Sequence, residues 1–155
     1  MTHQQFRKNA MPQPRTIDVL LAQYRASHRH PTNELIHAVC VPVIVFTLLG
    51  LLWSIHPLAA VAGCGAALAY YWKLSRPFAV GMLLMAIAML GLLALMPALT
   101  VLPLSIALFV VAWMGQFIGH QIEGKKPSFL EDLRFLLVGP LFVLGFLYRR
   151  LNVAY

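Results

Sequence analysis

The sequence predicts an all-α fold, an integral membrane bundle of four transmembrane helices. An N-terminal amphipathic helix is expected before the bundle, and a re-entrant or interfacial helical hairpin is expected after it. Residues of the AVILMFWYC set make up 60% of the 155 residues, and charged residues make up 11%, against about 25% in typical soluble domains. The apolar residues are gathered into long runs, which are typical of membrane-spanning helices.

The net charge of +7 does not indicate a nucleic-acid partner. The basic residues flank the apolar runs and form no surface on which basic and aromatic side chains alternate, so nucleic acid is excluded. Basic residues beside apolar spans instead favour contact with anionic membrane lipids. Membrane lipids are therefore the expected surroundings, and the chain could form homo-oligomers within them.

The polar residues 1–15 are expected to form a mobile tail before a single membrane domain at residues 16–155. Residues 16–27 have the period of an amphipathic helix that lies on the membrane surface or packs on the bundle. Thr16 is the expected N-cap of this helix. Its apolar face consists of Ile17, Leu20, Leu21 and Tyr24.

Four apolar segments are expected to cross the membrane, at about residues 38–55, 57–72, 77–96 and 100–119. Pro31 disfavours helix at His30, so the chain is expected to turn there. Thr32 can then cap a new helix that continues into the first span. Gly115 and Gly119, near the end of the fourth span, would allow another helix to approach closely.

The last apolar segment is too short for a fifth span. Within the expected hairpin at about residues 129–148, the apolar part covers only residues 135–148 and is interrupted by Gly139 and Pro140, whereas a span needs about 20 residues. If this segment returns to the face that it left, all twelve Lys and Arg lie on one side of the membrane. The positive-inside rule then puts both termini in the cytoplasm, at a bacterial inner membrane or, in a eukaryote, at the endoplasmic reticulum.

Two polar clusters flank the spans and are expected to meet at one membrane boundary. His28 and His37 precede the first span, and His120 and Glu123 follow the fourth. Histidine with carboxylate suits Fe, Zn, Mn or Ni, and two histidines with one carboxylate are the ligands of many non-haem Fe(II) oxygenases. Ionisable residues at membrane depth indicate a functional site, so the sequence predicts a metal centre there.

Each side chain also has a structural explanation. Asn33 and Gln116 could orient metal ligands, or they could belong to a polar stripe that only stabilises the bundle. His28 or His30 alone could be a solvated histidine at the interface, and His120 could form a structural pair with the carboxylate that follows it. These alternatives leave open a metal-dependent lipid hydrolase and a non-enzymatic membrane transporter or assembly protein.

Two long motifs carry a resemblance to a known family. The first is Tyr24-x3-His28-x4-Asn33-x3-His37 followed by Val41-Pro42, and the second is Gln116-Phe117-Ile118-Gly119-His120 followed by Glu123, Pro127 and Gly139-Pro140. With these motifs, over about residues 16–148, the chain resembles the 2-hydroxy fatty acid dioxygenases. These are small multi-pass membrane proteins typified by the fungal endoplasmic-reticulum enzyme of phytosphingosine α-oxidation.

The resemblance implies a membrane-bound, Fe(II)-dependent dioxygenase with O2 as co-substrate and no need for 2-oxoglutarate. Such an enzyme shortens a 2-hydroxy fatty acid by one carbon and releases CO2. By the same resemblance, His28, His37 and His120 are the expected metal ligands. Glu123 is expected as a fourth ligand or as a base, and His30, which matches no family position, is kept as a reserve ligand. Asn33 and Gln116 complete the expected catalytic residues.

Overall fold

A computed structural model describes residues 14–124 and 135–155 of the chain. Within these ranges every regular element is an α-helix, so the expectation of an all-α fold is confirmed. The helices are α2 (Thr16–Ala26), α3 (Pro31–Ile55), α4 (Pro57–Leu74), α5 (Arg76–Leu95), α6 (Ala98–Ile122) and α8 (Gly139–Arg150). Most of the expected mobile tail, residues 1–13, lies outside the described residues.

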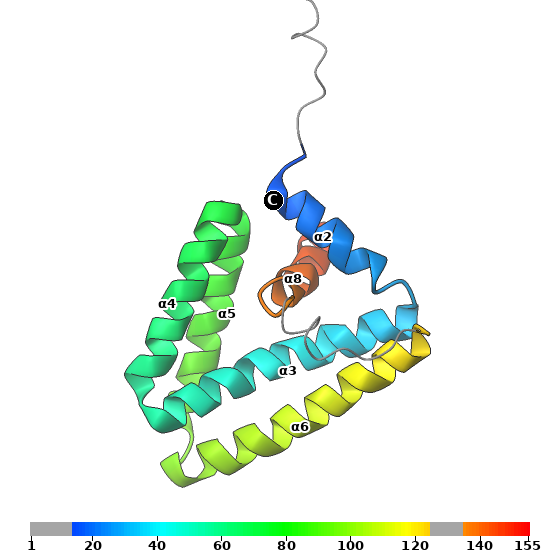
Figure 1. The fold of residues 1–155 in the computed structure, drawn as a ribbon. Helices are drawn as coiled ribbons and strands as arrows, with labels where there is room; N and C mark the ends of the chain where they lie inside the picture. The colour runs from blue at the N-terminus through cyan, green and yellow to red at the C-terminus, as the bar shows by residue number, and fades with distance from the viewer. Residues whose placement is uncertain (1–13, 125–134) are drawn as a thin grey trace, which may run out of the picture.

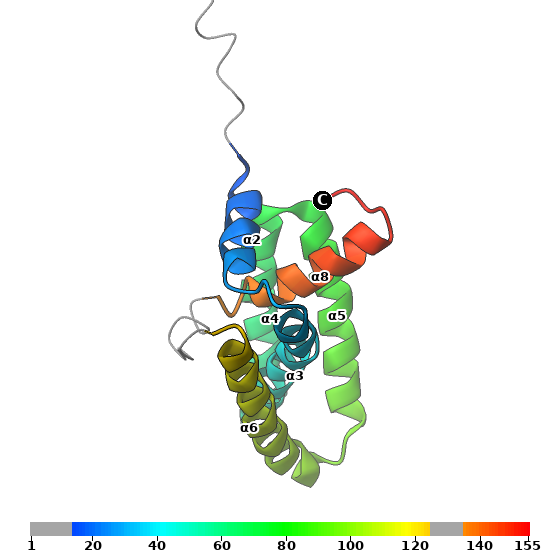
Figure 2. The same ribbon diagram turned by 90° about the vertical axis from the view of Figure 1, so that its right-hand side faces the viewer.

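The helices form two pairs that are closed at one end by the shorter helices. α4 and α5 run side by side, and α3 packs along α6 in the most extensive helix contact of the fold (Figure 1). The two pairs are inclined to each other and meet at the ends of α3 and α5. α2 and α8 contact each other beside the start of α3, and α8 also reaches α5 (Figure 2).

Two of the long helices begin in the same way, with a histidine followed by a proline. His30 is the N-cap of α3, and His56 is the N-cap of α4. The Nδ1 atom of His30 accepts a hydrogen bond from the Thr32 amide at 3.2 Å, and that of His56 accepts one from the Leu58 amide at 3.1 Å. The proline at the first helical position has no amide to satisfy. Thr32 was therefore wrongly expected to cap α3, because the histidine before the proline takes that role.

The start of α2 also differs from expectation. Its N-cap is Arg15, whose side chain makes no capping hydrogen bond, and Thr16 already lies inside the helix. The Arg15 guanidinium instead donates to both carboxylate oxygens of Asp18, at 2.8 and 2.9 Å. The expected apolar face of α2 is confirmed, because Ile17 and Leu21 are buried against the C-terminal segment around residues 138–142.

Small residues bring α3 and α6 together at the end where the polar side chains lie. A Cβ atom added to Gly115 would come within 2.7 Å of Cys40 Sγ, and one added to Gly119 would collide with Asn33 Oδ1. The Gly115 and Gly119 pair thus allows the close helix approach that its spacing predicts. This approach carries the last turn of α6 onto the first turns of α3.

Among the described helices, three are long and apolar enough to cross a membrane, namely α3, α5 and α6. α4 has 18 residues and is not among them, so the expected four-span topology stays a prediction. α3 begins at Pro31. Its first turns carry polar residues and precede the span expected at about 38–55. Of the expected hairpin, residues 129–134 lie outside the described residues, and the rest is a turn at 135–138 followed by α8.

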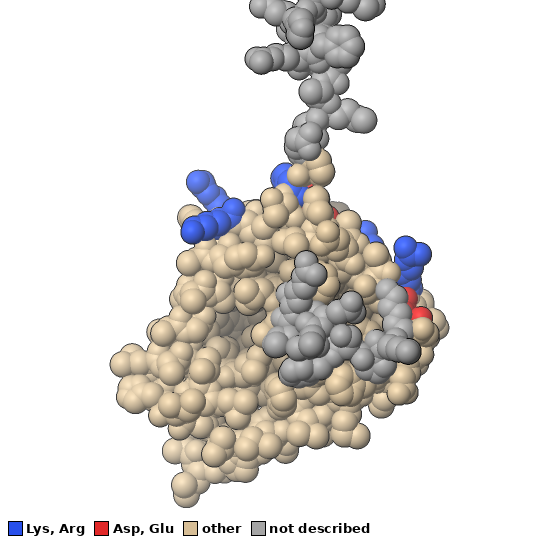
Figure 3. Space-filling view, viewed as in Figure 1, with Lys and Arg blue, Asp and Glu red and all other residues tan. Residues whose placement is uncertain are grey.

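Charged side chains are distributed unevenly over the face drawn in Figure 3. Lys and Arg gather along the edge that holds α2 and the junction of α4 and α5, where Lys73 and Arg76 lie. The opposite edge, where α3 meets α4 and α5 meets α6, shows no Lys, Arg, Asp or Glu in this view. Such a distribution is the one that the positive-inside rule associates with a cytoplasmic face.

Candidate metal centre

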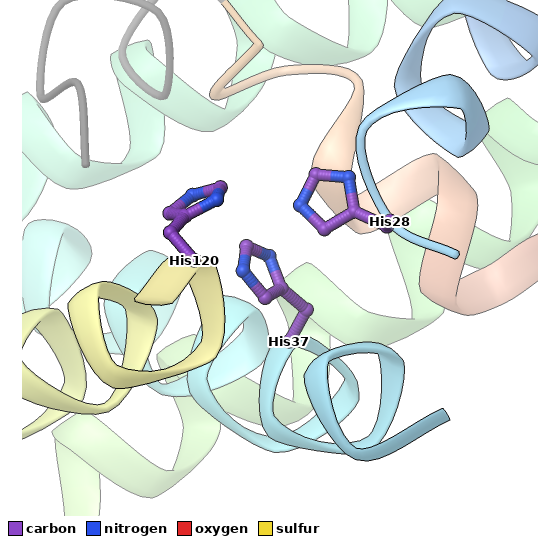
Figure 4. A group of neighbouring side chains, drawn as sticks. All are labelled: His28, His37 and His120. Carbon is purple, nitrogen blue, oxygen red and sulfur yellow. The ribbon is translucent and has the colours of Figure 1, made fainter. Parts of the chain in front are cut away.

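Three histidines from three parts of the chain converge at the charged end of the fold. His28 follows α2, His37 lies in the second turn of α3, and His120 lies in the last turn of α6. Their rings point toward one another (Figure 4), and one ligand nitrogen from each lies within 4.8 Å of the other two. The side chains are 4%, 1% and 6% exposed. Imidazole nitrogens that are so deeply buried need a hydrogen-bond partner or a metal ion.

Tyr24 holds two of these histidines in place. Its ring stacks on His28 with centroids 4.1 Å apart, and its hydroxyl lies 3.1 Å from His37 Nδ1. His28 Nδ1 donates a hydrogen bond to the Tyr24 carbonyl oxygen at 2.8 Å. Because that bond places the proton on Nδ1, the lone pair of His28 is on Nε2. The sequence predicted Tyr24 only as part of an apolar helix face and of the first motif, although its spacing of four residues from His28 places both on one face.

The cluster fits a metal ion. His37 Nε2 is buried and has no hydrogen-bond partner among the described residues, and an unsatisfied buried nitrogen costs about 1–3 kcal/mol. The His37 ring centroid lies 4.1 Å from that of His28 and 5.0 Å from that of His120. Protonated imidazoles would repel one another at this distance, whereas neutral ones can share a cation. Among the described residues, the donor set is three histidine nitrogens, with no carboxylate.

Glu123 is not part of this group of three. Its two oxygens accept hydrogen bonds from the Arg29 amide at 2.9 Å, the His30 amide at 2.8 Å and Asn33 Nδ2 at 3.1 Å. Partial burial acts to raise the pKa of the Glu123 carboxyl, but the hydrogen bonds from His30, Arg29 and Asn33 outweigh it and lower that pKa. The carboxylate therefore ties the end of α6 to the turn that carries His28.

Asn33 and Gln116, which lie on the same two helices as His37 and His120, each have a buried amide oxygen. Asn33 is fully buried, and Gln116 is 4% exposed. Asn33 Oδ1 and Gln116 Oε1 have no hydrogen-bond partner among the described residues. Gln116 lines a cavity of about 30 Å³ together with Tyr24 and Leu136. That volume is enough for one water molecule or one polar group of a ligand.

The reserve ligand His30 does not join the cluster. Its side chain is exposed and its Nδ1 accepts the capping hydrogen bond from Thr32. The metal group found among residues 14–124 and 135–155 contains His28, His37 and His120. The three ligands expected from the family resemblance are thus the three that the fold brings together, and whether they bind metal stays a prediction.

Comparison with known proteins identifies the family of the chain. A family model described as 2-hydroxy-palmitic acid dioxygenase Mpo1-like matches residues 15–151. This chain belongs to the Mpo1-like family. The match covers all six described helices, and so it includes the three clustered histidines. The family expected from the two sequence motifs is therefore confirmed.

One curated relative of the Mpo1-like family is similar over most of its length. The 2-hydroxy-palmitic acid dioxygenase MPO1 of Saccharomyces cerevisiae is 30% identical over 133 residues, which are 80% of this chain and 75% of the relative. No solved structure matches the chain. The family thus supports an oxidoreductase of the dioxygenase type, and the geometry adds a buried group of three histidines.

Proposed function

We propose that this protein is a membrane-bound, non-haem Fe(II) dioxygenase that shortens 2-hydroxy fatty acids by one carbon. The observation that carries this proposal is the buried cluster of His28, His37 and His120 in a member of a dioxygenase family. In the overall reaction, one 2-hydroxy acid and one O2 give the fatty acid one carbon shorter, one CO2 and one water. The substrate supplies all the electrons that reduce O2, so no second organic reductant is needed.

The three histidines are the residues that would hold the iron. When bound, Fe(II) supplies the redox chemistry for the activation of O2, as in other non-haem iron oxygenases. Tyr24 keeps the two nearest rings oriented, through its stacking on His28 and its hydrogen bond to His37. Burial of all three rings keeps water away from the reacting atoms.

The remaining polar side chains have separate roles in this proposal. Gln116 Oε1 is a buried acceptor that can accept a hydrogen bond from a substrate hydroxyl group. Glu123 and Asn33 are positioning residues, because they join the end of α6 to the turn before α3. Both oxygens of Glu123 accept hydrogen bonds from backbone or side-chain amides. In this proposal Glu123 is therefore a structural brace that holds two segments together, in place of the fourth ligand or base expected from the family resemblance.

The position of the cluster suits an amphiphilic substrate. A 2-hydroxy fatty acid has a charged head, which stays at the membrane interface, and an apolar chain, which stays in the hydrocarbon. The histidines lie at the charged end of α3 and α6, beside apolar helices. The head can therefore reach them without leaving the membrane surface. This arrangement needs an even number of crossings from the start of α3 to the end of α6, as in the expected topology of four spans with both termini in the cytoplasm.

Metal analysis and oxygen uptake test the proposal. The protein purified in detergent is expected to contain iron and to consume O2 when 2-hydroxypalmitic acid is added, with formation of the acid one carbon shorter. His120→Ala should lose iron and turnover together while keeping its helical circular-dichroism spectrum. Absence of transition metal from the active wild-type protein, or product formation under nitrogen, would contradict the proposal.

A zinc-dependent lipid hydrolase is the second candidate. It is favoured by the composition of the cluster in the described part of the chain, because three histidines are also the ligands of some catalytic zinc sites. This candidate predicts zinc in the purified protein and activity that does not need O2. The same two measurements therefore separate the two functions.

A further inference from the structure

A groove of about 180 Å³ lies between α3, α4 and α5. Its walls include Leu52 of α3, Gly63 and Ala67 of α4, and Ala86 and Met89 of α5. Residues 136–140 border it at the charged end of the fold. Figure 3 shows the molecule hollowed on this face, beside the pair formed by α4 and α5. We refer to this space as the α4–α5 groove.

The α4–α5 groove is lined by side chains suited to hydrocarbon. The one tyrosine in its wall, Tyr71, donates its hydroxyl hydrogen bond to the Leu137 carbonyl oxygen at 3.0 Å. No groove residue has a buried side-chain polar atom without a hydrogen-bond partner among the described residues. Water would therefore gain few hydrogen bonds there, whereas an apolar chain would gain contact.

The groove adjoins the small cavity beside the histidine cluster, and the two share one wall residue. Leu136 lines the α4–α5 groove and also the cavity of about 30 Å³ that holds Gln116 and Tyr24. Tyr24 is in turn hydrogen-bonded to His37 at 3.1 Å. A molecule with a polar head at the histidines could thus pass Leu136 and place an apolar tail in the groove.

A second apolar groove is a weaker candidate for the same tail. It has a volume of about 240 Å³ between the start of α3 and α8, and its walls include Glu34 and Val143. It shares no lining residue with the cavity at Gln116. It also exposes a carboxylate, which hydrocarbon does not solvate. The connection and the lining both favour the α4–α5 groove.

We propose that the α4–α5 groove binds the saturated acyl chain of the substrate, and that its far end limits the chain length. This inference rests on the proposed function for the identity of the head group. The chain would enter past Leu136 and run along α4 from Tyr71 toward Gly63, a distance of about 12 Å at 1.5 Å per residue. Ala86 and Met89 lie on the opposite wall of its outer half.

Three matched substitutions test the chain-length limit. Ala86→Phe fills the outer half of the groove, Ala88→Phe adds the same ring at an exposed position of the same helix, and Val143→Phe fills the second groove. With short and long saturated 2-hydroxy acids, Ala86→Phe should lower kcat/KM for the long acids by about tenfold relative to the short ones. The other two variants should keep the wild-type preference. An unchanged preference in Ala86→Phe, an equal loss at every length, or a shift in Val143→Phe would overturn the inference.

Photo-crosslinking tests the same placement without turnover. The probe is 2-hydroxypalmitic acid with a diazirine at the end of its chain, added to the full-length wild-type protein in the absence of O2. Adducts identified by mass spectrometry are expected on residues 63–68 of α4 and 82–89 of α5. Adducts confined to the second groove or to the lipid-facing helix surfaces, or no adducts at all, would overturn the inference.

The two readouts separate this inference from the proposed function. Adducts in the α4–α5 groove of a protein that consumes no O2 would contradict the dioxygenase and leave the chain-binding site standing. Turnover of 2-hydroxypalmitic acid with adducts elsewhere would support the dioxygenase and contradict the chain-binding site.

Discussion

At the scale of single residues, Tyr24 joins two members of the histidine cluster. It contacts His28 by stacking and His37 by a hydrogen bond, from a helix that does not cross the membrane. Its ring also packs on Phe142 of α8, with centroids 4.9 Å apart. The C-terminal helix therefore supports the histidine cluster in two ways. Phe142 packs on Tyr24, and the Phe142 ring centroid also lies 6.3 Å from that of His28.

Tyr24→Phe is expected to weaken metal binding while keeping the fold. The phenyl ring can still stack on His28, but the hydrogen bond that fixes the His37 ring is lost. Loss of such a partner typically lowers metal affinity by about 10- to 100-fold. Iron retained after dialysis against a graded chelator measures the change. Tyr70→Phe, at an exposed tyrosine of α4, is the matched control, and equal retention in both variants would argue against the role of the hydroxyl.

Glu123→Gln tests whether Glu123 is a structural brace or a metal ligand. Glu123→Gln leaves one acceptor oxygen and turns an amide group toward backbone donors, so it should destabilise the protein by about 1–3 kcal/mol. Because the brace does not touch the metal, the variant should still bind iron at full stoichiometry when iron is in excess. The midpoint of thermal unfolding and the iron content measure the two effects.

Glu34→Gln is the control for this substitution. Glu34 lies in the first turn of the same helix that Glu123 braces, and its replacement should leave the unfolding midpoint nearly unchanged. Loss of iron from Glu123→Gln at an unchanged midpoint would instead identify Glu123 as a ligand.

At the scale of elements, the close pairing of α3 with α6 decides where the histidines meet. His37 and His120 come from these two helices, and Gly119 leaves the space that Asn33 occupies between them. A bulkier residue at this contact would push the helices apart at the metal centre. Cores respond to such overpacking with a cost of about 1–3 kcal/mol.

Gly119→Ala is therefore expected to lower both stability and iron affinity. Gly91→Ala on α5 is the matched control, because a Cβ atom there meets nothing within 4 Å. That control should be neutral or stabilising, since alanine is a better helix former than glycine by about 1 kcal/mol. Differential scanning calorimetry and metal analysis of both variants check the prediction, which fails if Gly119→Ala behaves like the control.

The N-caps of α2 and α3 were predicted wrongly from local sequence preferences. The expected caps, Thr16 and Thr32, have the preferred side chains for an N-cap, but the N-cap residues are Arg15 and His30 instead. At α3 the reason is local, because Pro31 takes the first helical position and the residue before it becomes the cap. At α2 the pairing of Arg15 with Asp18 holds the first turn without a capping hydrogen bond.

At the scale of the whole molecule, the histidine cluster constrains the topology. His37 lies near the start of α3 and His120 near the end of α6, yet their rings are neighbours. The number of crossings between them must therefore be even. α3, α5 and α6 are each apolar enough to cross, so α4 should cross too. Its 18 residues span about 27 Å, close to the roughly 30 Å of a hydrocarbon core.

Cysteine labelling tests this topology. Leu99 is 92% exposed at the start of α6, and Lys73 is exposed near the end of α4. In a background in which Cys40 and Cys64 are replaced by alanine, Leu99→Cys should react with a membrane-impermeant maleimide in intact cells. Lys73→Cys should react only after the membrane is permeabilised. Labelling of both under the same condition would contradict four crossings with cytoplasmic termini.

The sequence by itself determined the fold class, the membrane character and the family. Long apolar runs and flanking basic residues are local properties of the chain, and the two motifs hold all three histidines. It also predicted that distant histidines would meet, because an even number of spans returns the chain to the same face.

Only the tertiary structure decided which polar residues share the centre. Glu123 and His30 have the right chemistry for ligands, but the geometry at the α3 start uses them as a brace and a cap. The sequence motif contains Tyr24 but does not show what its side chain contacts, and no motif indicates the α4–α5 groove. Both depend on contacts between helices that are far apart along the chain. Spacing places a side chain on a helix face, whereas packing determines what that side chain meets.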